Sequence, residues 1–150
     1  MSFKLSQRSL DRLEGLDPDL IEVVKRAIKY TKVDFGVTEG LRTEETQRKY
    51  VAAGKSQTMK SKHLEGRAVD VVAYIGSNIS WELNLYDDIC DAFKKAAEEV
   101  GVAIKWGSAW SEGDIRSYSG TSEDAMNAYI DLRRSQGRRP FIDAPHFELM

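Results

Sequence analysis

The chain has 150 residues, of which 41% are hydrophobic and 31% are charged. This composition is typical of one folded globular domain and excludes a disordered chain. The formal net charge of −2 gives no overall attraction for nucleic acid, and no apolar run approaches the roughly 20 residues that a membrane-spanning helix needs.

The first half of the chain predicts two helices and one strand before a polar loop. The first helix begins after Asp17, an N-cap residue that is followed by Pro18 in the first turn. Its apolar residues recur at helical spacing: Leu20, Ile21, Val24, Ala27 and Ile28. A strand, a helix and a loop are then predicted over residues 35–38, 43–53 and 55–62.

The second half predicts a buried central strand over residues 68–75, because this segment is nearly all apolar. A long helix over residues 81–100 follows, with Ser80 as its N-cap and Gly101 at its end. The stretch 107–120 is rich in glycine and serine and predicts a mobile loop. The other elements are a strand, a helix and a strand that would close the sheet: residues 102–106, 122–135 and 147–149. This order predicts an α+β fold in one domain, with helices packed on a small, largely antiparallel sheet.

The single cysteine, Cys90, excludes an intrachain disulfide and a zinc site made of several thiolates. Cys90 is expected to be a small, half-buried apolar residue on a helix. A chain without disulfides suits a reducing cytosol. Residues 1–8 lack the apolar stretch of a secretory signal.

Both histidines of the chain are followed or preceded by carboxylates at short spacing. His63 and Asp70 are seven residues apart, a spacing that a straight strand would place on opposite faces. A bend is therefore expected between them, and Gly66 is the residue that permits it. Asp70 stands in an apolar run, where an isolated ionised carboxylate is costly to bury. Either a metal ion or another cation compensates Asp70, or it is protonated; ligation and a structural salt bridge explain it equally well.

The second histidine, His146, follows Asp143 by three residues near the carboxyl end. Pro145 disfavours helical backbone just before it, so the pair is expected in an extended segment that enters the last strand. Two imidazoles and one carboxylate leave a fourth tetrahedral position open, which is the arrangement of a catalytic zinc site. Asp143, close to the metal but not bound to it, would accept a proton from attacking water and return it to the leaving amine.

Two further side chains are candidates for substrate contact. The planar cation of Arg42 suits a substrate carboxylate or a developing oxyanion, although an arginine after a strand is often structural or merely exposed. Ser61 suits a hydrogen bond to substrate, or the formation of a loop. A basic cluster also stands out, and it is more simply a solvated helix face and loop than a polyanion site: Arg133, Arg134, Arg138 and Arg139.

The joint pattern resembles a known family. The motif SxHxxGxAxD over residues 61–70, followed by DxxH over residues 143–146, is similar to the zinc D-alanyl-D-alanine carboxypeptidase group. That group includes the vancomycin-resistance dipeptidases and the phage L-alanyl-D-glutamate endolysins, and it shares a fold with the hedgehog signalling domain. The segments GLRT over residues 40–43 and WGSAW over residues 106–110 also match the group.

The resemblance implies a ligand set and two further roles. Its ligands to one zinc ion would be His63, Asp70 and His146. Asp143 would be the catalytic carboxylate, and Arg42 would stabilise the substrate or transition state.

At one position the chain differs from most of the group, and at another the members of the group differ among themselves. Ala109 stands where members of the group often carry an acidic residue. This difference concerns the wall of the pocket and not the binding of zinc. Many dipeptidases carry glutamate at the position of Asp143, whereas aspartate is more typical of the phage endopeptidases.

The function that the resemblance implies is cleavage of the L-Ala–D-Glu bond in the peptide stem of peptidoglycan, with lysis of the bacterial host. Residues 1–150 would form the catalytic domain of a monomer, with no wall-binding domain and no membrane insertion. The enzyme would pass from the host cytoplasm to the periplasm through a pore such as a holin. Two alternatives stay open: a D,D-carboxypeptidase that trims terminal D-alanine, and a non-catalytic zinc-binding interaction module.

Overall fold

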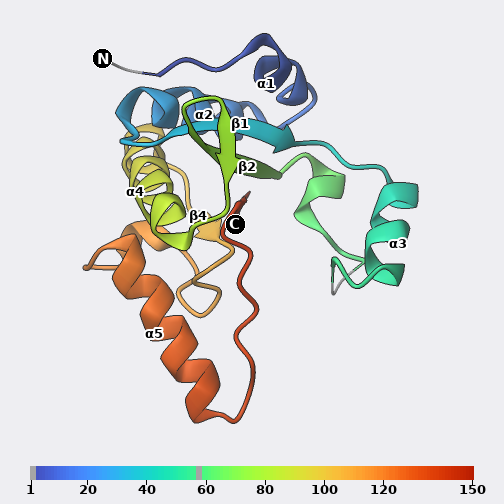
Figure 1. The fold of residues 1–150 in the computed structure, drawn as a ribbon. Coiled ribbons are helices and arrows are strands. Elements are labelled where there is room, and N and C mark those ends of the chain that lie inside the picture. Colours follow the sequence, from blue (N-terminus) through green and yellow to red (C-terminus); the bar gives the residue numbers. More distant parts are fainter. Residues whose placement is uncertain (1–2, 57–58) are drawn as a thin grey trace.

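The computed structural model describes residues 3–56 and 59–150. This part of the chain forms helices around one antiparallel sheet of five strands (Figure 1). The helices are α1 (Gln7–Arg12), α2 (Pro18–Tyr30), α3 (Glu44–Ala52), α4 (Leu83–Val100) and α5 (Ser122–Ser135), with two short 3-10 helices, η1 (Lys62–Glu65) and η2 (Ile115–Ser117). The strands are β1 (Asp34–Glu39), β2 (Ala68–Ile75), β3 (Asn78–Ser80), β4 (Ile104–Trp106) and β5 (His146–Leu149). The α+β prediction is confirmed.

The sheet is organised around β2, as its apolar sequence predicts. The strand order is β1-β2-β5-β4, and β3 pairs with the end of β2. All pairings are antiparallel. The last strand of the chain therefore does not close the sheet at an edge, because β5 lies between β2 and β4. This register sets Asp70 of β2 directly opposite His146 of β5 and beside Glu39 of β1.

The core lies between the sheet and the pair formed by α2 and α4, which pack side by side. The predicted cap of α2 is present, since the side chain of Asp17 accepts a hydrogen bond from the Asp19 amide. Phe147 of β5 stacks on Phe93 of α4 with ring centroids 3.9 Å apart. Because strand residues alternate between faces, a core-facing Phe147 turns its two neighbours toward the opposite side of the sheet.

The start of α4 differs from the prediction. The helix begins at Leu83 rather than at residue 81, and Glu82 is its N-cap without a side-chain hydrogen bond. Ser80 does not cap it, because it ends β3 and pairs with Ala73 of β2. Strand pairing across the tight turn between β2 and β3 thus replaces the predicted cap.

Burial also corrects two further expectations. Cys90 on α4 is completely buried rather than half-buried. The stretch 107–120 is no plain loop, because it contains η2 with the buried Ile115, and Ala109 is also buried. Of the described helices, none has the length and apolar character to cross a membrane.

Candidate metal centre

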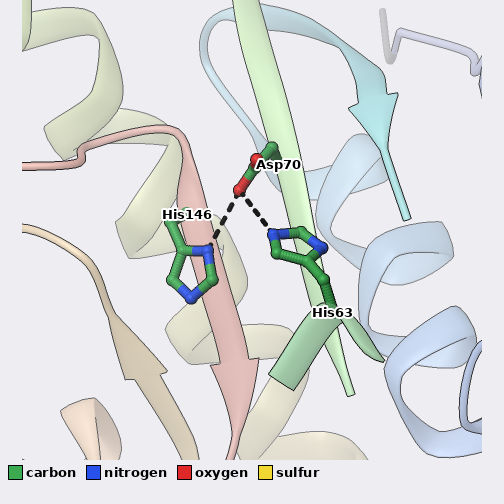
Figure 2. Close-up of side chains that lie close together, drawn as sticks. All are labelled: His63, Asp70 and His146. Atoms are coloured by element: carbon green, nitrogen blue, oxygen red, sulfur yellow. Dashed lines mark hydrogen bonds and ion pairs between the residues drawn. The ribbon is translucent and has the colours of Figure 1, made fainter. Parts of the chain in front are cut away.

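Two imidazoles point at one carboxylate oxygen in a buried corner of the structure (Figure 2). The Nε2 atom of His63 lies 3.2 Å from Oδ1 of Asp70, and the Nδ1 atom of His146 lies 3.0 Å from the same oxygen. One ligand atom from each residue lies within 4.8 Å of the other two, a spacing that a metal ion can bridge. The structure thus brings together all three ligands that the sequence predicts.

A tight turn carries His63 to Asp70. His63 lies in η1, whose first amide groups are held by Ser61: its side-chain oxygen accepts a hydrogen bond from the His63 amide at 3.2 Å. Gly66 ends η1 with a φ of 70°, a left-handed conformation that glycine adopts without strain. The expected bend is therefore at Gly66, and it lets β2 start directly after the turn.

Hydrogen bonds fix which ring nitrogen of each histidine faces Asp70. Nδ1 of His63 lies 2.8 Å from the Gly40 carbonyl oxygen, and Nε2 of His146 lies 2.7 Å from Oε1 of Glu148. Both partners are acceptors, so these two ring nitrogens must donate protons. In a neutral imidazole the other nitrogen then carries a lone pair, and this lone pair points at Oδ1 of Asp70. Acceptors held like this are typical outer partners of metal-bound histidines.

Three lone pairs facing one point require a cation between them. Without a metal, protons fill this role: burial alone lowers the pKa of His146, but its hydrogen bonds to Asp70 and Glu148 raise it to about 10. Burial raises the pKa of Asp70, yet the two imidazoles outweigh this effect and hold it below its usual value. A metal ion entering the site must displace protons, so its affinity falls as the pH falls.

Asp143 lies beside this centre but is not one of the three converging residues. Gly107 fixes its backbone, since the Asp143 amide donates to the Gly107 carbonyl at 2.8 Å. A side chain on Gly107 would collide with the Asp143 carbonyl, so glycine is required there. Burial, together with the charge of Asp70, raises the pKa of Asp143. A carboxylate with a raised pKa next to a metal centre suits transient proton transfer.

Arg42 is buried and mostly bound by the protein itself. Its guanidinium forms two hydrogen bonds to Glu39, at 2.6 and 2.9 Å, and one to Gln47 at 2.6 Å. It also stacks on the ring of Tyr50 at 4.5 Å. Nη2 lies 3.7 Å from Oδ2 of Asp70. The salt bridge that the sequence left as one alternative for Asp70 is therefore present, and the candidate ligands of the other alternative converge at the same side chain.

The centre opens into a cleft of about 670 Å³. On one side Trp110 stacks on Phe141 with centroids 6.4 Å apart, and Trp110 lies 5.6 Å from the ring of His146. Ser61 lines the cleft as well. Ala109 does not, because its side chain is buried behind the wall. The departure at this position therefore lies outside the set of residues that line the cleft.

Sequence reasoning missed the residues that hold the ligands in place. Glu148 lies two residues after His146 on the same face of β5, and this strand spacing is the signal that predicts their contact. Glu39 precedes Arg42 by three residues, a spacing that suggested nothing in a strand-to-loop segment. The carbonyl of Gly40 carries no sequence signal at all.

The arginine cluster at the end of α5 lies apart from the cleft. The side chain of Arg133 donates a hydrogen bond to the Arg139 carbonyl at 3.2 Å, which ties the end of the helix to the chain that follows. Of the four arginines, none lines the cleft, and α5 extends away from the sheet (Figure 1).

The sequence and the structure are both similar to those of known peptidases. The family model of the phage L-alanyl-D-glutamate peptidases matches residues 1–150. The L-alanyl-D-glutamate peptidase of Escherichia phage T5 is 33% identical over 115 residues, 74% of this chain and 84% of that protein. The enzyme of the same name from Listeria phage A118 is 29% identical over 107 residues, 69% of this chain and 37% of that protein. The crystal structure of the Serratia marcescens L-Ala D-Glu endopeptidase ChiX gives a TM-score of 0.73 and 36% identity, covering 98% of this chain and 90% of that chain.

The α+β fold is thus that of an L-Ala D-Glu endopeptidase. The chain belongs to the phage L-alanyl-D-glutamate peptidase family. The resemblance seen in the sequence is confirmed.

The buried contacts of Arg42 predict intolerance even of lysine. Arg42→Lys loses the two-point contact with Glu39 and should lower the free energy of unfolding by about 1–3 kcal/mol. Arg42→Ala leaves the half-buried Glu39 without its cation and should lower the free energy of unfolding further than Arg42→Lys does. Urea denaturation measures both, with Arg48→Lys on the exposed face of α3 as the control. An Arg42→Lys protein as stable as wild type would contradict the structural role.

Proposed function

We propose that this protein is a zinc-dependent peptidoglycan peptidase that cleaves the L-Ala–D-Glu bond of the peptide stem. Its family supports the reaction, since the relatives from phage T5 and Serratia marcescens are named for that bond. One observation supports the metal: one ring nitrogen of each imidazole faces the same carboxylate oxygen, while the other ring nitrogen contacts an acceptor outside the centre. Two nitrogens and one oxygen are a usual donor set for catalytic zinc.

In the proposed site His63, Asp70 and His146 hold one zinc ion, which when bound polarises the scissile carbonyl. Asp143 takes the proton from the attacking water and delivers it to the leaving amine. Its raised pKa favours this exchange, because the carboxyl group holds a proton more readily than an exposed aspartate does.

Arg42 and Ser61 are proposed to act on the substrate from the cleft wall. Arg42 lines the cleft next to Asp70, so its fixed positive charge lies near the carbonyl on which negative charge develops. The oxygen of Ser61 already accepts from the His63 amide, which leaves its hydroxyl proton for a substrate acceptor. Both side chains are held by the protein before substrate arrives, so their orientation costs little on binding.

The cellular setting follows from the substrate. On this proposal residues 1–150 form a catalytic domain that acts as a monomer on peptidoglycan in the periplasm. It reaches that compartment from the host cytoplasm through a membrane lesion such as a holin makes. Mass spectrometry of digested muropeptides separates the proposed cut from the trimming of terminal D-alanine, because only the endopeptidase frees the stem beyond L-Ala.

Substitution of the proposed base should separate catalysis from metal binding. Asp143→Asn is expected to retain zinc and to lose about 100- to 10,000-fold in turnover, because the amide cannot accept the proton. His63→Ala is expected to lose both zinc and activity. The loss of turbidity of permeabilised Gram-negative cells measures the activity of each variant, and the zinc content is measured on the same protein preparations. Lysis by Asp143→Asn at the wild-type rate would refute the assigned base.

Loss of the outer carboxylate should weaken metal binding without removing a ligand. Glu148→Ala removes the acceptor that orients His146 and should lower zinc affinity by about 10- to 100-fold. Glu148→Gln keeps a neutral acceptor and should fall between this variant and wild type. Competition with a chromophoric chelator gives the affinities, with Glu45→Ala on the exposed face of α3 as the control. Equal affinities for Glu148→Ala and wild type would show that the contact does not position His146.

A further inference from the structure

One wall of the cleft carries positive charge, and this wall is separate from the candidate metal centre. Three lysines line the cleft between the end of α3 and the first residue of η1: Lys55, Lys60 and Lys62. α3 and η1 lie together at one side of the molecule (Figure 1). The acidic groups that line the cleft belong to β1, β2, β5 and the segment before β5: Glu39, Asp70, Asp143 and Glu148. A ligand bound in the cleft therefore meets cations on the α3–η1 side.

Lys62 is the lysine whose position is best fixed. It is the first residue of η1 and the direct neighbour of His63, so its backbone lies close to the candidate metal centre. Its backbone is held, since its carbonyl accepts a hydrogen bond from the Arg67 amide at 3.0 Å. Lys62 is half-buried and lines the cleft.

The cations of the cleft differ in what holds them. Arg42 is bound in two-point contact by Glu39, and the ammonium of Lys55 lies over the ring of Tyr50 at 5.8 Å. Within the described parts of the chain, Lys62 forms no ion pair with any carboxylate. A half-buried ammonium that lines a cleft and has no carboxylate partner suits an anionic ligand.

The substrate of the proposed function carries such an anion next to the reacting bond. The glutamate that supplies the scissile nitrogen has two carboxyl groups. One of them continues the peptide stem, and the other remains a free carboxylate unless it is capped as an amide. With the scissile carbonyl at the metal centre, this residue lies within reach of a lysine adjacent to His63. The carboxylates of Asp143 and Glu148 would repel this anion, so its binding requires a cation nearby.

We propose that Lys62 forms a carboxylate subsite, which selects stems whose glutamate keeps its free carboxylate over stems in which that group is an amide. This inference rests on the proposed function and names the substrate feature that the same cleft distinguishes. The ammonium of Lys62 donates a charge-assisted hydrogen bond to the carboxylate. A neutral amide offers only a weaker acceptor to the same ammonium and adds N–H donors that it cannot satisfy.

The test compares two soluble stem peptides that differ only in that group, acid or amide, as substrates of the zinc-loaded full chain. The ratio of kcat/KM for acid over amide is measured for wild type, Lys62→Gln, Lys62→Arg and the control Lys49→Gln. Lys49 lies on α3 with a highly exposed side chain and does not line the cleft. The ratio is independent of the fraction of folded protein, because both peptides meet the same sample.

Wild type should prefer the acid by about 10-fold or more. Lys62→Gln should bring the ratio close to one, Lys62→Arg should keep most of the preference, and Lys49→Gln should behave as wild type. An unchanged ratio in Lys62→Gln, or a wild-type preference for the amide, overturns the subsite while the proposed function stands. A zinc-loaded wild type that cleaves neither peptide overturns the proposed function and the subsite with it.

Discussion

The contact on which the structure depends is the meeting of two imidazole nitrogens at one oxygen of Asp70. In a neutral imidazole each of these nitrogens would be an acceptor, because the opposite ring position donates to the Gly40 carbonyl or to Glu148. An arrangement of acceptors around a buried oxygen repels itself unless positive charge enters it. In this chain protons or a divalent cation supply that charge. The proposed metal ion would take the place of these protons, so the acid–base behaviour of the site and its proposed metal affinity have one cause.

The sheet positions two of the three residues that form this contact. β2 is paired on both sides and carries Asp70, while β5 carries His146 directly opposite. Phe147 points to the other face and stacks in the core on Phe93, so the packing of the core sets the position of the ligand before it. Only His63 comes from outside the sheet. It is held by the turn at Gly66 and by the cap that Ser61 provides. A site on rigid elements needs little reorganisation when a metal or a substrate binds.

Much of this architecture was predictable from the sequence because it follows from local rules. The cap at Asp17, the apolar stripe of α2 and the apolar run of β2 each act within a few residues. The bend at Gly66 was predictable from an odd spacing between two residues of one proposed site. The motif pattern extended this to the three residues that converge, whereas their metal binding and the roles of Asp143, Arg42 and Ser61 stay proposals.

The remaining features depend on contacts that form only in the folded chain. Ser80 has the character of an N-cap, but pairing with β2 places it in a strand instead. The helical pattern predicts a half-buried Cys90, whereas the packing of α4 buries this residue completely. Arg42 gives no local sign that Glu39, Gln47 and Tyr50 surround its side chain. Such contacts arise only when the chain has folded, so residue type and spacing alone do not reveal them.

X-ray absorption at the zinc edge of the purified protein tests whether His63, Asp70 and His146 bind one metal ion. We expect one zinc ion per chain, coordinated by nitrogen and oxygen only at about 2.0–2.1 Å, with the scattering pattern of two imidazoles. The His63→Ala protein should lose this signal. A sulfur ligand at about 2.3 Å, or a metal-free protein that cleaves peptide stems at full rate, would contradict this expectation.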